Sequence, residues 1–216
     1  MSWLDEYYPV LLDLAGRACL VVGGGKVAER KVAGLLEAGA SVVVVSPAVT
    51  PGLASLAGTG ALRWAGRAYQ PGDLVGTVLV VAAAGDPAVN RQVAWDSRSA
   101  GKLVNVADEP ALCDFFVPAA LRRGRLTIAV STGGTSPALA ARIRDRLAGM
   151  FPAGWGPYLD FLGEMRERVR HGVRDRQKRR DMLEQLAGEE IWKLLEKGDF
   201  AAAKERVDLV YRRSGG

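Results

Sequence analysis

Apolar and polar positions along the first half of the chain alternate between two patterns, one typical of buried strands and one typical of amphipathic helices. Short apolar runs predict five strands, over residues 18–24, 41–47, 61–69, 76–86 and 102–108. Between the first two runs, Ala28, Val32, Leu35 and Leu36 recur at helical spacing and predict a helix over 26–38. Strands that alternate with helices predict a parallel sheet with helices on both faces.

Start and stop signals agree with this alternation. Gly39 ends the first helix, and a weaker helix is predicted over about 50–58. Asp86 is a suitable N-cap, Pro87 suits the first helical position, and that helix should reach about Ala100. The pattern predicts an α/β fold, a Rossmann-like doubly wound parallel sheet. Ligands of such sheets bind beyond the carboxyl ends of the strands, where the strand order reverses.

The pattern changes after Asp108. A strand is predicted over 125–131, then a Gly-rich loop, then a helix that begins at Ser136-Pro137. From Trp155 onward the sequence predicts three or four amphipathic helices and no strand. We therefore expect three parts, covering residues 1–113, 114–150 and 151–216.

The stretch LVVGGGKVAER at positions 20–30 predicts a phosphate-binding turn. Gly23, Gly25 and Ala28 match the pattern G-x-G-x-x-G/A, and a strand precedes them while a helix follows. Gly25 would let backbone N–H groups approach a pyrophosphate, which the helix N-terminus attracts. The alternative is a glycine turn in a sheet that binds nothing. Ser46-Pro47 stands where a ribose-binding acid is expected, so this position leaves NAD and NADP both open.

Two further segments are candidates for chemistry. Asp108 follows the fifth strand, at the predicted ligand edge, where a carboxylate can act as a general base. An Asp after a strand is also a common turn residue. The loop STGGTSP at 131–137 precedes a helix, so it either binds an anion such as a substrate carboxylate or only caps the helix.

Composition narrows the class of protein. The 216 residues are 49% apolar, which is enough for a core, and no run of 18 apolar residues predicts a membrane span. The N-terminus has no basic region of the kind that opens a secretion signal. Two cysteines, Cys19 and Cys113, favour a reducing cytoplasm, and the single His argues against a tight metal site. The net charge of +5 suits nucleic acid, anionic lipid or a polyanionic small substrate.

Several blocks together resemble one family. The segment YYPVLLDLAGRACLVVGGGKVAERKVAGLLEAGASVVVVSP (7–47) resembles the opening of precorrin-2 dehydrogenases, the N-terminal module of siroheme synthases. NVADEP (105–110), FFVPA (115–119) and AVSTGGTSPALA (129–140) resemble later blocks of that family, in the same order. The resemblance covers about 1–150, and the helical tail agrees with it in length and type.

The resemblance implies a reaction and a site. Members of the family oxidise precorrin-2 to sirohydrochlorin with NAD⁺, and some also insert ferrous iron to give siroheme. The family's key acid falls on Asp108. Its NAD contacts fall on Gly23, Gly24, Gly25, Lys26, Val27, Ser46 and Pro47. Its substrate-binding segments fall on Asn105 and on Ser131, Thr132, Gly133, Gly134, Thr135 and Ser136, and it implies no resident metal. A serine that some relatives carry before the paired glycines is Thr132 here.

The resemblance also implies an assembly. The family forms intertwined homodimers, in which 114–150 would be the dimerisation and substrate segment, between a Rossmann domain over 1–113 and a small helical domain over 151–216. The absence of a fused methyltransferase domain implies a stand-alone form. The substrate carries eight carboxylates, which a positive protein can attract. Candidate arginines for these carboxylates are Arg122, Arg123, Arg125, Arg142 and Arg144, although each is individually a typical solvated residue.

The basic stretch at 166–180 contains His171 and eight Lys or Arg against two acids. It lacks interleaved aromatic residues and any nucleic-acid-binding motif, so a solvated helix face near the substrate is favoured, with neither nucleic acid nor membrane as partner. Three alternatives to the dehydrogenase stay open: a non-catalytic NAD-sensing module, a chelatase that has lost oxidation, and another small oxidoreductase.

Overall fold

The chain forms two compact units, residues 1–117 and 118–216, in a computed structural model that describes residues 7–213. Each unit has its own core and is described by itself. The expectation about a secretion signal concerns an N-terminus that lies largely outside the described residues. The predicted division into three parts, at 113 and 150, stays a prediction.

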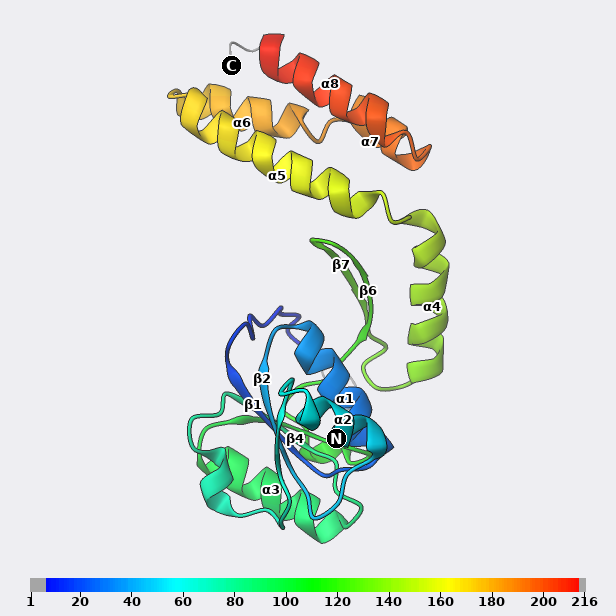
Figure 1. Cartoon of the computed structure of the whole chain (residues 1–216). Coiled ribbons are helices and arrows are strands. Elements are labelled where there is room, and N and C mark those ends of the chain that lie inside the picture. Colours follow the sequence, from blue (N-terminus) through cyan, green and yellow to red (C-terminus); the bar gives the residue numbers. More distant parts are fainter. Residues whose placement is uncertain (1–6, 214–216) are drawn as a thin grey trace. The chain divides into compact units, whose positions relative to one another are not determined.

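The first unit contains the predicted parallel sheet (Figure 1). Its strands are β1 (Ala18–Val22), β2 (Ser41–Val45), β3 (Arg63–Ala65), β4 (Leu79–Ala82) and β5 (Leu103–Val106). They lie in the order β3-β2-β1-β4-β5, and every pair is parallel. The predicted doubly wound fold is confirmed. The observed strands end before the predicted ones, because the chain leaves the ladder at Gly, Ser and Ala residues to form loops along the carboxyl edge.

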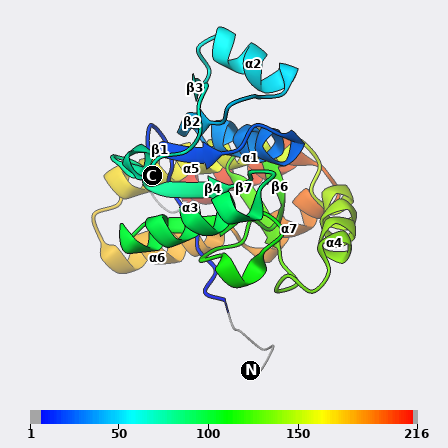
Figure 2. The same cartoon turned by 90° about the horizontal axis from the view of Figure 1, so that it is seen from below.

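Helices cover both faces of this sheet, as Figure 2 shows for α1 and α3. They are α1 (Lys26–Glu37), α2 (Pro51–Gly58) and α3 (Pro87–Ser99), with short 3₁₀ helices η1 (Pro71–Leu74) and η2 (Pro110–Leu112). Successive side chains of a strand point to opposite faces. In β1, Cys19 and Val21 therefore pack in the cluster that contains α1, whereas Leu20 and Val22 pack in the cluster that contains α3.

The second unit begins with a two-stranded hairpin, β6 (Ala119–Arg123) and β7 (Leu126–Val130), and continues into α4 (Pro137–Met150). The sequence pattern predicts β7 but gives no signal for β6. The segment Ala-Ala-Leu-Arg-Arg has no β-branched or aromatic residue, so its strand preference is weak. The two-residue turn at Gly124 and Arg125 requires a positive φ, and Gly124 has φ 56°.

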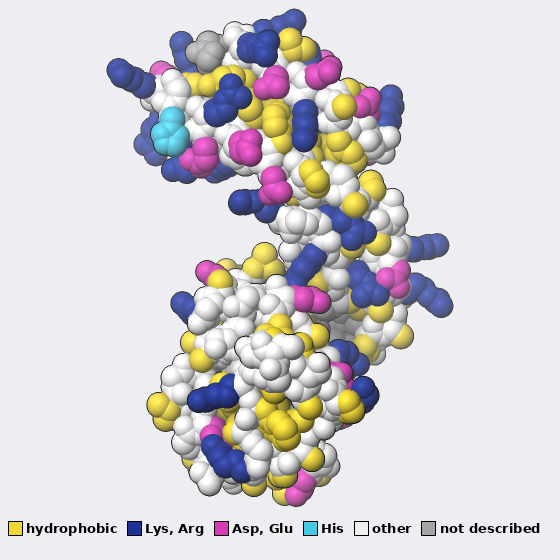
Figure 3. Space-filling view, in the orientation of Figure 1, with side chains coloured by type: hydrophobic (Ala, Val, Ile, Leu, Met, Phe, Trp, Pro, Cys, Tyr) yellow, Lys and Arg dark blue, Asp and Glu magenta, His cyan; other side chains and the backbone are white. Residues whose placement is uncertain are grey.

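Four helices complete the second unit, which confirms the predicted helical tail. They are α5 (Trp155–Gly172), α6 (Arg176–Gln185), α7 (Glu189–Glu196) and α8 (Phe200–Arg213). Their core includes Tyr158, Met165, Met182 and Val207. On the visible face of the second unit, Lys and Arg side chains are scattered among acidic and apolar ones (Figure 3). Within residues 7–213, no helix is both long enough and apolar enough to cross a bilayer.

Candidate functional site

Loops gather at the carboxyl edge of the parallel sheet. The strand order reverses between β1 and β4, which is where doubly wound sheets bind ligands. Gly23 follows β1, Ser46 follows β2 and Asp108 follows β5, so all three lie at this edge. Because β5 is two strands from β1, the two strand ends are separated by about 10 Å across the sheet.

The first two glycines of the turn are required by close packing. Gly23 has φ 124°, and a Cβ there would overlap the backbone carbonyl of Ala83, which follows β4. A Cβ on Gly24 would overlap the carbonyl of Ala48, which follows β2. The turn is therefore clamped between the loops that follow β4 and β2, and no side chain fits in either contact.

Gly25 differs from its neighbours, because a Cβ there would face open space. It is the N-cap of α1, and no side chain makes a capping hydrogen bond to this helix. The first N–H groups of a helix have no partner within the helix, and a helix N-terminus attracts anions. The space beside Gly25 and these free donors together fit the pyrophosphate of a dinucleotide.

Three predicted cofactor residues surround this turn. Lys26 is exposed and forms an ion pair with Glu29, with Nζ and Oε2 3.0 Å apart, and this pairing, with a further hydrogen bond to Thr50, lowers the pKa of Glu29. Val27 packs against the core below α1. Ser46 lies beside Gly24, and its hydroxyl donates to the Ala48 carbonyl at 2.7 Å. The Ser46 oxygen keeps its capacity to accept a bond from a ribose hydroxyl.

The loop after Ser46 provides no acid for the ribose. Pro47 is exposed, and the Ser46 carbonyl accepts a hydrogen bond from the Trp64 indole at 2.9 Å. The backbone of this segment is therefore fixed by Trp64, which holds the serine in place beside the glycine turn.

Asp108 has a left-handed backbone conformation with φ 61°, the only such non-Gly residue among those described. Its side chain is exposed. Asp and Asn adopt this conformation more readily than other residues with a Cβ. The conformation reverses the chain directly after β5, while the Ala107 N–H remains bonded to the Ala82 carbonyl at 2.8 Å. Asp108 therefore stands at the tip of a tight turn with its carboxylate in solvent.

The loop behind Asp108 is held by its own side chains. The Cys113 thiol accepts from the Val106 N–H and donates to the Val106 carbonyl, both at 3.2 Å. The Asp114 carboxylate accepts from the Val104 N–H at 3.0 Å and from Arg98. The structural role of Cys113 is not predictable from the sequence, because a thiol that replaces a ladder partner leaves no signal in a sequence pattern.

Asn105 is buried and fully bonded. Its amide donates to the Phe115 carbonyl at 2.9 Å and contacts Cys113, and its oxygen accepts from Lys31 Nζ at 3.0 Å. Lys31 is not among the residues predicted from the sequence to belong to the site. A signal was present, since Lys31 lies between Val27 and Leu35 at i+4 spacing, on the face of α1 that packs on the core.

The other predicted substrate residues belong to the second unit. Thr132 Oγ1 accepts from the Ser136 N–H at 3.0 Å, and Ser131 Oγ accepts from the Gly133 N–H at 3.2 Å. Ser136 caps α4 by accepting from the Leu139 N–H. These hydroxyls act as turn and cap acceptors, which leaves their O–H groups able to donate. Gly133 and Gly134 supply the positive φ values that bring Thr135 back toward Thr132.

The candidate arginines are partly engaged within the second unit. Arg123 donates to the Phe151 carbonyl at 2.8 Å, Arg125 pairs with Asp160, and Arg144 pairs with Asp145. Arg122 also has a partner, whereas Arg142 has none among the described residues. Most of these arginines are therefore surface residues that already have partners.

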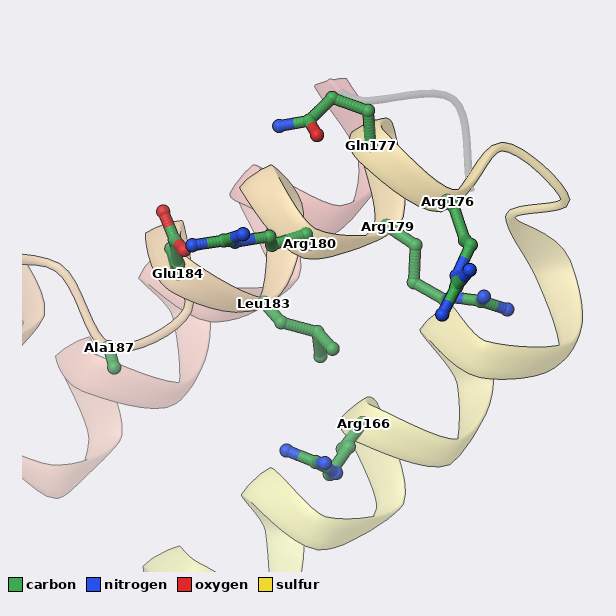
Figure 4. A pocket seen from close by; sticks show the side chains of 8 residues that line it. All are labelled: Arg166, Arg176, Gln177, Arg179, Arg180, Leu183, Glu184 and Ala187. Carbon is green, nitrogen blue, oxygen red and sulfur yellow. The ribbon is translucent and has the colours of Figure 1, made fainter.

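A cavity of about 700 Å³ lies between α5 and α6 (Figure 4). Arg166, Arg176, Arg179 and Arg180 line it, and Arg180 points toward Glu184, with which it pairs at 3.0 Å. The basic stretch at 166–180 thus lines a positively charged cavity. None of the predicted cofactor or substrate residues lines this cavity.

The exposed ring of His171 bonds the Glu167 carbonyl at 2.8 Å. Among the described residues, no group of three His, Cys, Asp or Glu has a metal-binding arrangement.

Two family models match the chain. A model for NAD(P)-binding proteins matches residues 10–119, which include the glycine turn, Ser46 and Asp108. A model described as "Sirohaem biosynthesis protein central" matches residues 123–150, which include β7 and α4. The division between these two matches falls within the β6 strand.

Curated relatives carry the name siroheme synthase. The chain is 42% identical over 214 residues to the siroheme synthase of Methylobacillus flagellatus and 40% identical over 203 residues to that of Chromobacterium violaceum. These alignments cover 97% and 94% of the chain but only 45% and 43% of the relatives. The chain thus spans somewhat less than half the length of the curated relatives it matches.

A solved structure extends the comparison over the whole fold. The structure named "SirC, precorrin-2 dehydrogenase" superposes with a TM-score of 0.72 at 32% sequence identity, and the match covers 93% of this chain and 100% of that one. With a matched cofactor domain, a matched central segment and a full-length structural neighbour, the chain belongs to the precorrin-2 dehydrogenase and siroheme synthase family.

Proposed function

We propose that this chain oxidises precorrin-2 to sirohydrochlorin with NAD⁺ as the hydride acceptor. The observation that carries the proposal is the sheet edge, at which the open turn at Gly25 and the carboxylate of Asp108 follow strands that lie two apart. The full-length similarity to a precorrin-2 dehydrogenase and the NAD(P)-binding match over 10–119 support it.

The glycine turn would hold the cofactor. The backbone N–H groups at the start of α1 would bind the pyrophosphate, and Ser46 would bond a ribose hydroxyl from the neighbouring strand end. When bound there, NAD⁺ supplies the acceptor for a hydride. Gly23 and Gly24 contribute indirectly, since their contacts with the Ala83 and Ala48 carbonyls hold the turn in place.

Asp108 would take the proton. Oxidation of the substrate removes two electrons with one hydrogen as a hydride and removes a second hydrogen as a proton, so that a single bond becomes a double bond. The exposed Asp108 carboxylate accepts that proton and passes it to solvent water. Its left-handed backbone conformation turns the chain directly after the strand that ends at Val106.

The substrate's carboxylates would be bound by hydroxyl and cationic groups. Ser131, Thr132 and Ser136 use their oxygens as acceptors within the loop and retain O–H groups to donate. The net charge of +5 attracts an anion that carries several carboxylates. Arg142 is exposed and pairs with no described residue, so it can meet a carboxylate without first losing a partner.

We also propose a homodimer that forms through segment 114–150. Leu139, Ile143 and Met150 are exposed on α4 at 49%, 37% and 67%, and their spacing places them on one face of the helix. An exposed apolar stripe of this kind is typical of an interface. Leu139→Asp combined with Ile143→Asp should convert the dimer to a monomer in light-scattering measurements, whereas Leu209→Asp, at an exposed Leu on α8, should not.

A cytoplasmic location is the third part of the proposal. Cys19 and Cys113 are both free thiols, and Cys113 uses its S–H to bond the Val106 carbonyl, so the fold employs this cysteine in its reduced form. Fractionation of cells that produce the chain should recover it with cytoplasmic markers, and recovery from an oxidising compartment would contradict this part.

The test of the reaction supplies precorrin-2 and NAD⁺ to the purified chain and follows both NADH absorbance and the tetrapyrrole spectrum. We expect NADH and sirohydrochlorin to form in equal amounts. Absence of NADH at every enzyme concentration, with NAD⁺ still bound, would favour a sensor module instead.

A second arm of the same experiment separates oxidation from metal insertion. Sirohydrochlorin and ferrous ion are supplied without NAD⁺, and the siroheme spectrum is followed. Insertion here with no NADH in the first arm would identify a chelatase that has lost oxidation.

A further inference from the structure

Lys31 occupies an unusual position for a lysine. It lies on the core-facing side of α1, between Val27 and Leu35, which both pack in the apolar cluster. Its ammonium donates to the oxygen of Asn105 at 3.0 Å, across 74 residues of sequence. Burial lowers the pKa of Lys31 from its ordinary value of 10.5, and Arg30 lowers it further. A lysine that bears this cost needs compensation by specific partners.

The partners of Lys31 all belong to the segment that carries Asp108. Asn105 uses its amide to bond the Phe115 carbonyl, so it fastens the end of β5 to the far end of the loop. The Asp108 carboxylate counteracts the lowering of the Lys31 pKa, as does Cys113 where its thiol is ionised. Lys31 therefore bonds the anchor of this loop, and the Asp108 carboxylate at its tip acts electrostatically on the same ammonium.

Two ion pairs also hold the loop, in addition to the bonds of Cys113 and Asp114 described above. Arg91 on α3 pairs with Glu109 at 3.7 Å, and Arg98 pairs with Asp114 at 3.0 Å. Both pairs are partly exposed, and exposed pairs contribute little to stability. The buried bond from Asn105 to the Phe115 carbonyl joins the two ends of the loop, so the placement of Asp108 depends on it more than on these two exposed pairs.

We propose that Lys31 is a positioning residue, whose ammonium holds Asn105 and thereby fixes the loop 106–115 so that the Asp108 carboxylate is presented at the sheet edge. The inference rests on the proposed function and deepens it, because it assigns a residue of α1 to the set that prepares proton abstraction. Lys31 itself touches neither the substrate nor the cofactor in this role. Small displacements of a reacting group by a distant change reduce rates by up to about 100-fold.

The first measurement needs no substrate. Hydrogen exchange of the full chain is compared for the parent, Lys31→Met, and Lys102→Met as a matched control. Lys102 directly precedes β5, so it lies at the amino ends of the strands, opposite the carboxyl edge that carries Asp108. It pairs with no described residue. We expect amides of 106–115 to exchange at least about tenfold faster in Lys31→Met alone. Unchanged exchange would overturn the proposal whatever the reaction is.

The second measurement uses precorrin-2 and NAD⁺. Lys31→Met should lower kcat at least about tenfold with little change in KM or in NAD⁺ affinity, and Lys31→Arg should recover part of the loss. A kcat within twofold of the parent, or a loss confined to NAD⁺ affinity, would overturn the positioning role. If the parent shows no oxidation at all, the proposed function fails, while the exchange result still decides the role of Lys31.

The pH profile supplies a readout that a merely structural role would not change. If the protonated ammonium is required, the rate of the parent should fall as the pH rises through the lowered pKa of Lys31. Arg30, Cys113 and Asp108 are the charged or titratable groups that act on it. The alkaline fall should persist in Cys113→Ser and move to higher pH in Lys31→Arg, because a guanidinium stays protonated. An alkaline fall that disappears in Cys113→Ser would assign the titration to the thiol and contradict the proposal.

Discussion

At the scale of single residues, Asp108 provides both the proposed base and a residue in the left-handed backbone conformation, and substitutions can separate these two roles. Asp108→Asn removes the base but retains a side chain that adopts the left-handed conformation readily. Asp108→Ala removes the base and adds a backbone cost of about 1 kcal/mol. Both variants should lose oxidation while NAD⁺ affinity stays within about twofold of the parent, but only Asp108→Ala should melt earlier. Turnover retained by Asp108→Asn would remove the carboxylate from the mechanism.

The three consecutive glycines should respond differently to substitution. Gly25→Asp places a negative charge beside the pyrophosphate but meets open space and creates a good N-cap, so stability should hold or rise slightly. NAD⁺ affinity should fall by at least about tenfold, which calorimetric titration measures. Affinity equal to that of the parent would contradict the cofactor site.

Gly23→Ala serves as the contrasting variant. Its Cβ would overlap the Ala83 carbonyl at a φ of 124°, so we expect a loss of at least about 2 kcal/mol in the free energy of unfolding. Urea denaturation in the absence of ligand measures this loss. A Gly23→Ala variant as stable as the parent would show that the turn is not clamped as described.

How much of the site was predictable depends on the kind of signal each residue leaves. The glycine turn, Ser46 and Asp108 could be placed at one edge, because strand ends of a parallel sheet are readable from apolar runs. The clamping of Gly23 and Gly24 by the Ala83 and Ala48 carbonyls could not, since it depends on how the neighbouring loops pack. Lys31 left a weak signal, a charge within an apolar stripe. The part played by Cys113 left none.

At the scale of elements, the short helix η1 depends on one carboxylate. Asp73 forms two hydrogen bonds with Arg67 and accepts from the Gln70 N–H at 2.9 Å, within a reciprocal capping arrangement. These bonds, with that to Arg67 first, lower the pKa of Asp73. The stabilisation is thus present above the ordinary pKa of an aspartate and is lost as the pH falls through the lowered value.

Asp73→Asn tests this dependence. The melting temperature of the variant should be lower than that of the parent at neutral pH. The difference should shrink as the pH falls below about 4, the ordinary pKa of an aspartate, and toward the lowered pKa at which the folded parent's carboxylate becomes protonated. Asp13→Asn serves as a control, since this exposed carboxylate bonds only the Ala15 N–H nearby. A melting-point difference for Asp73→Asn that is constant with pH would contradict the assignment.

Elements also show where prediction from sequence succeeds. Strands β1, β2 and β4 are buried runs rich in Val and Leu, and all were predicted within a few residues. Strand β3 has only three residues at the sheet edge, much shorter than its predicted range, because an edge strand has one partner and little burial. Strand β6 was missed, since its pairing with β7 follows from the turn at Gly124 rather than from its own composition.

At the scale of the whole molecule, each compact unit has its own core. The clusters around β1 and β4 lie within the first unit, and the cluster around Tyr158 and Met165 lies within the second. We expect residues 1–117 produced alone to fold and bind NAD⁺ with affinity within about tenfold of the full chain. Because Ser131, Thr132 and Ser136 are absent from this fragment, it should not oxidise precorrin-2. Circular dichroism and calorimetric titration test folding and binding, and full turnover by the fragment would exclude the second unit from the reaction.

The clamped glycine turn has a consequence for how the dinucleotide is recognised. Backbone contacts to Ala83 and Ala48, rather than the ligand, give the turn its shape, so the receptor for the diphosphate is already formed before any cofactor arrives. Binding of the dinucleotide then costs little conformational entropy of the turn. The affinity for the dinucleotide reflects how well the preorganised backbone amides replace the water that hydrates its diphosphate. Because the turn is already formed, we expect the cofactor to bind first and without the substrate.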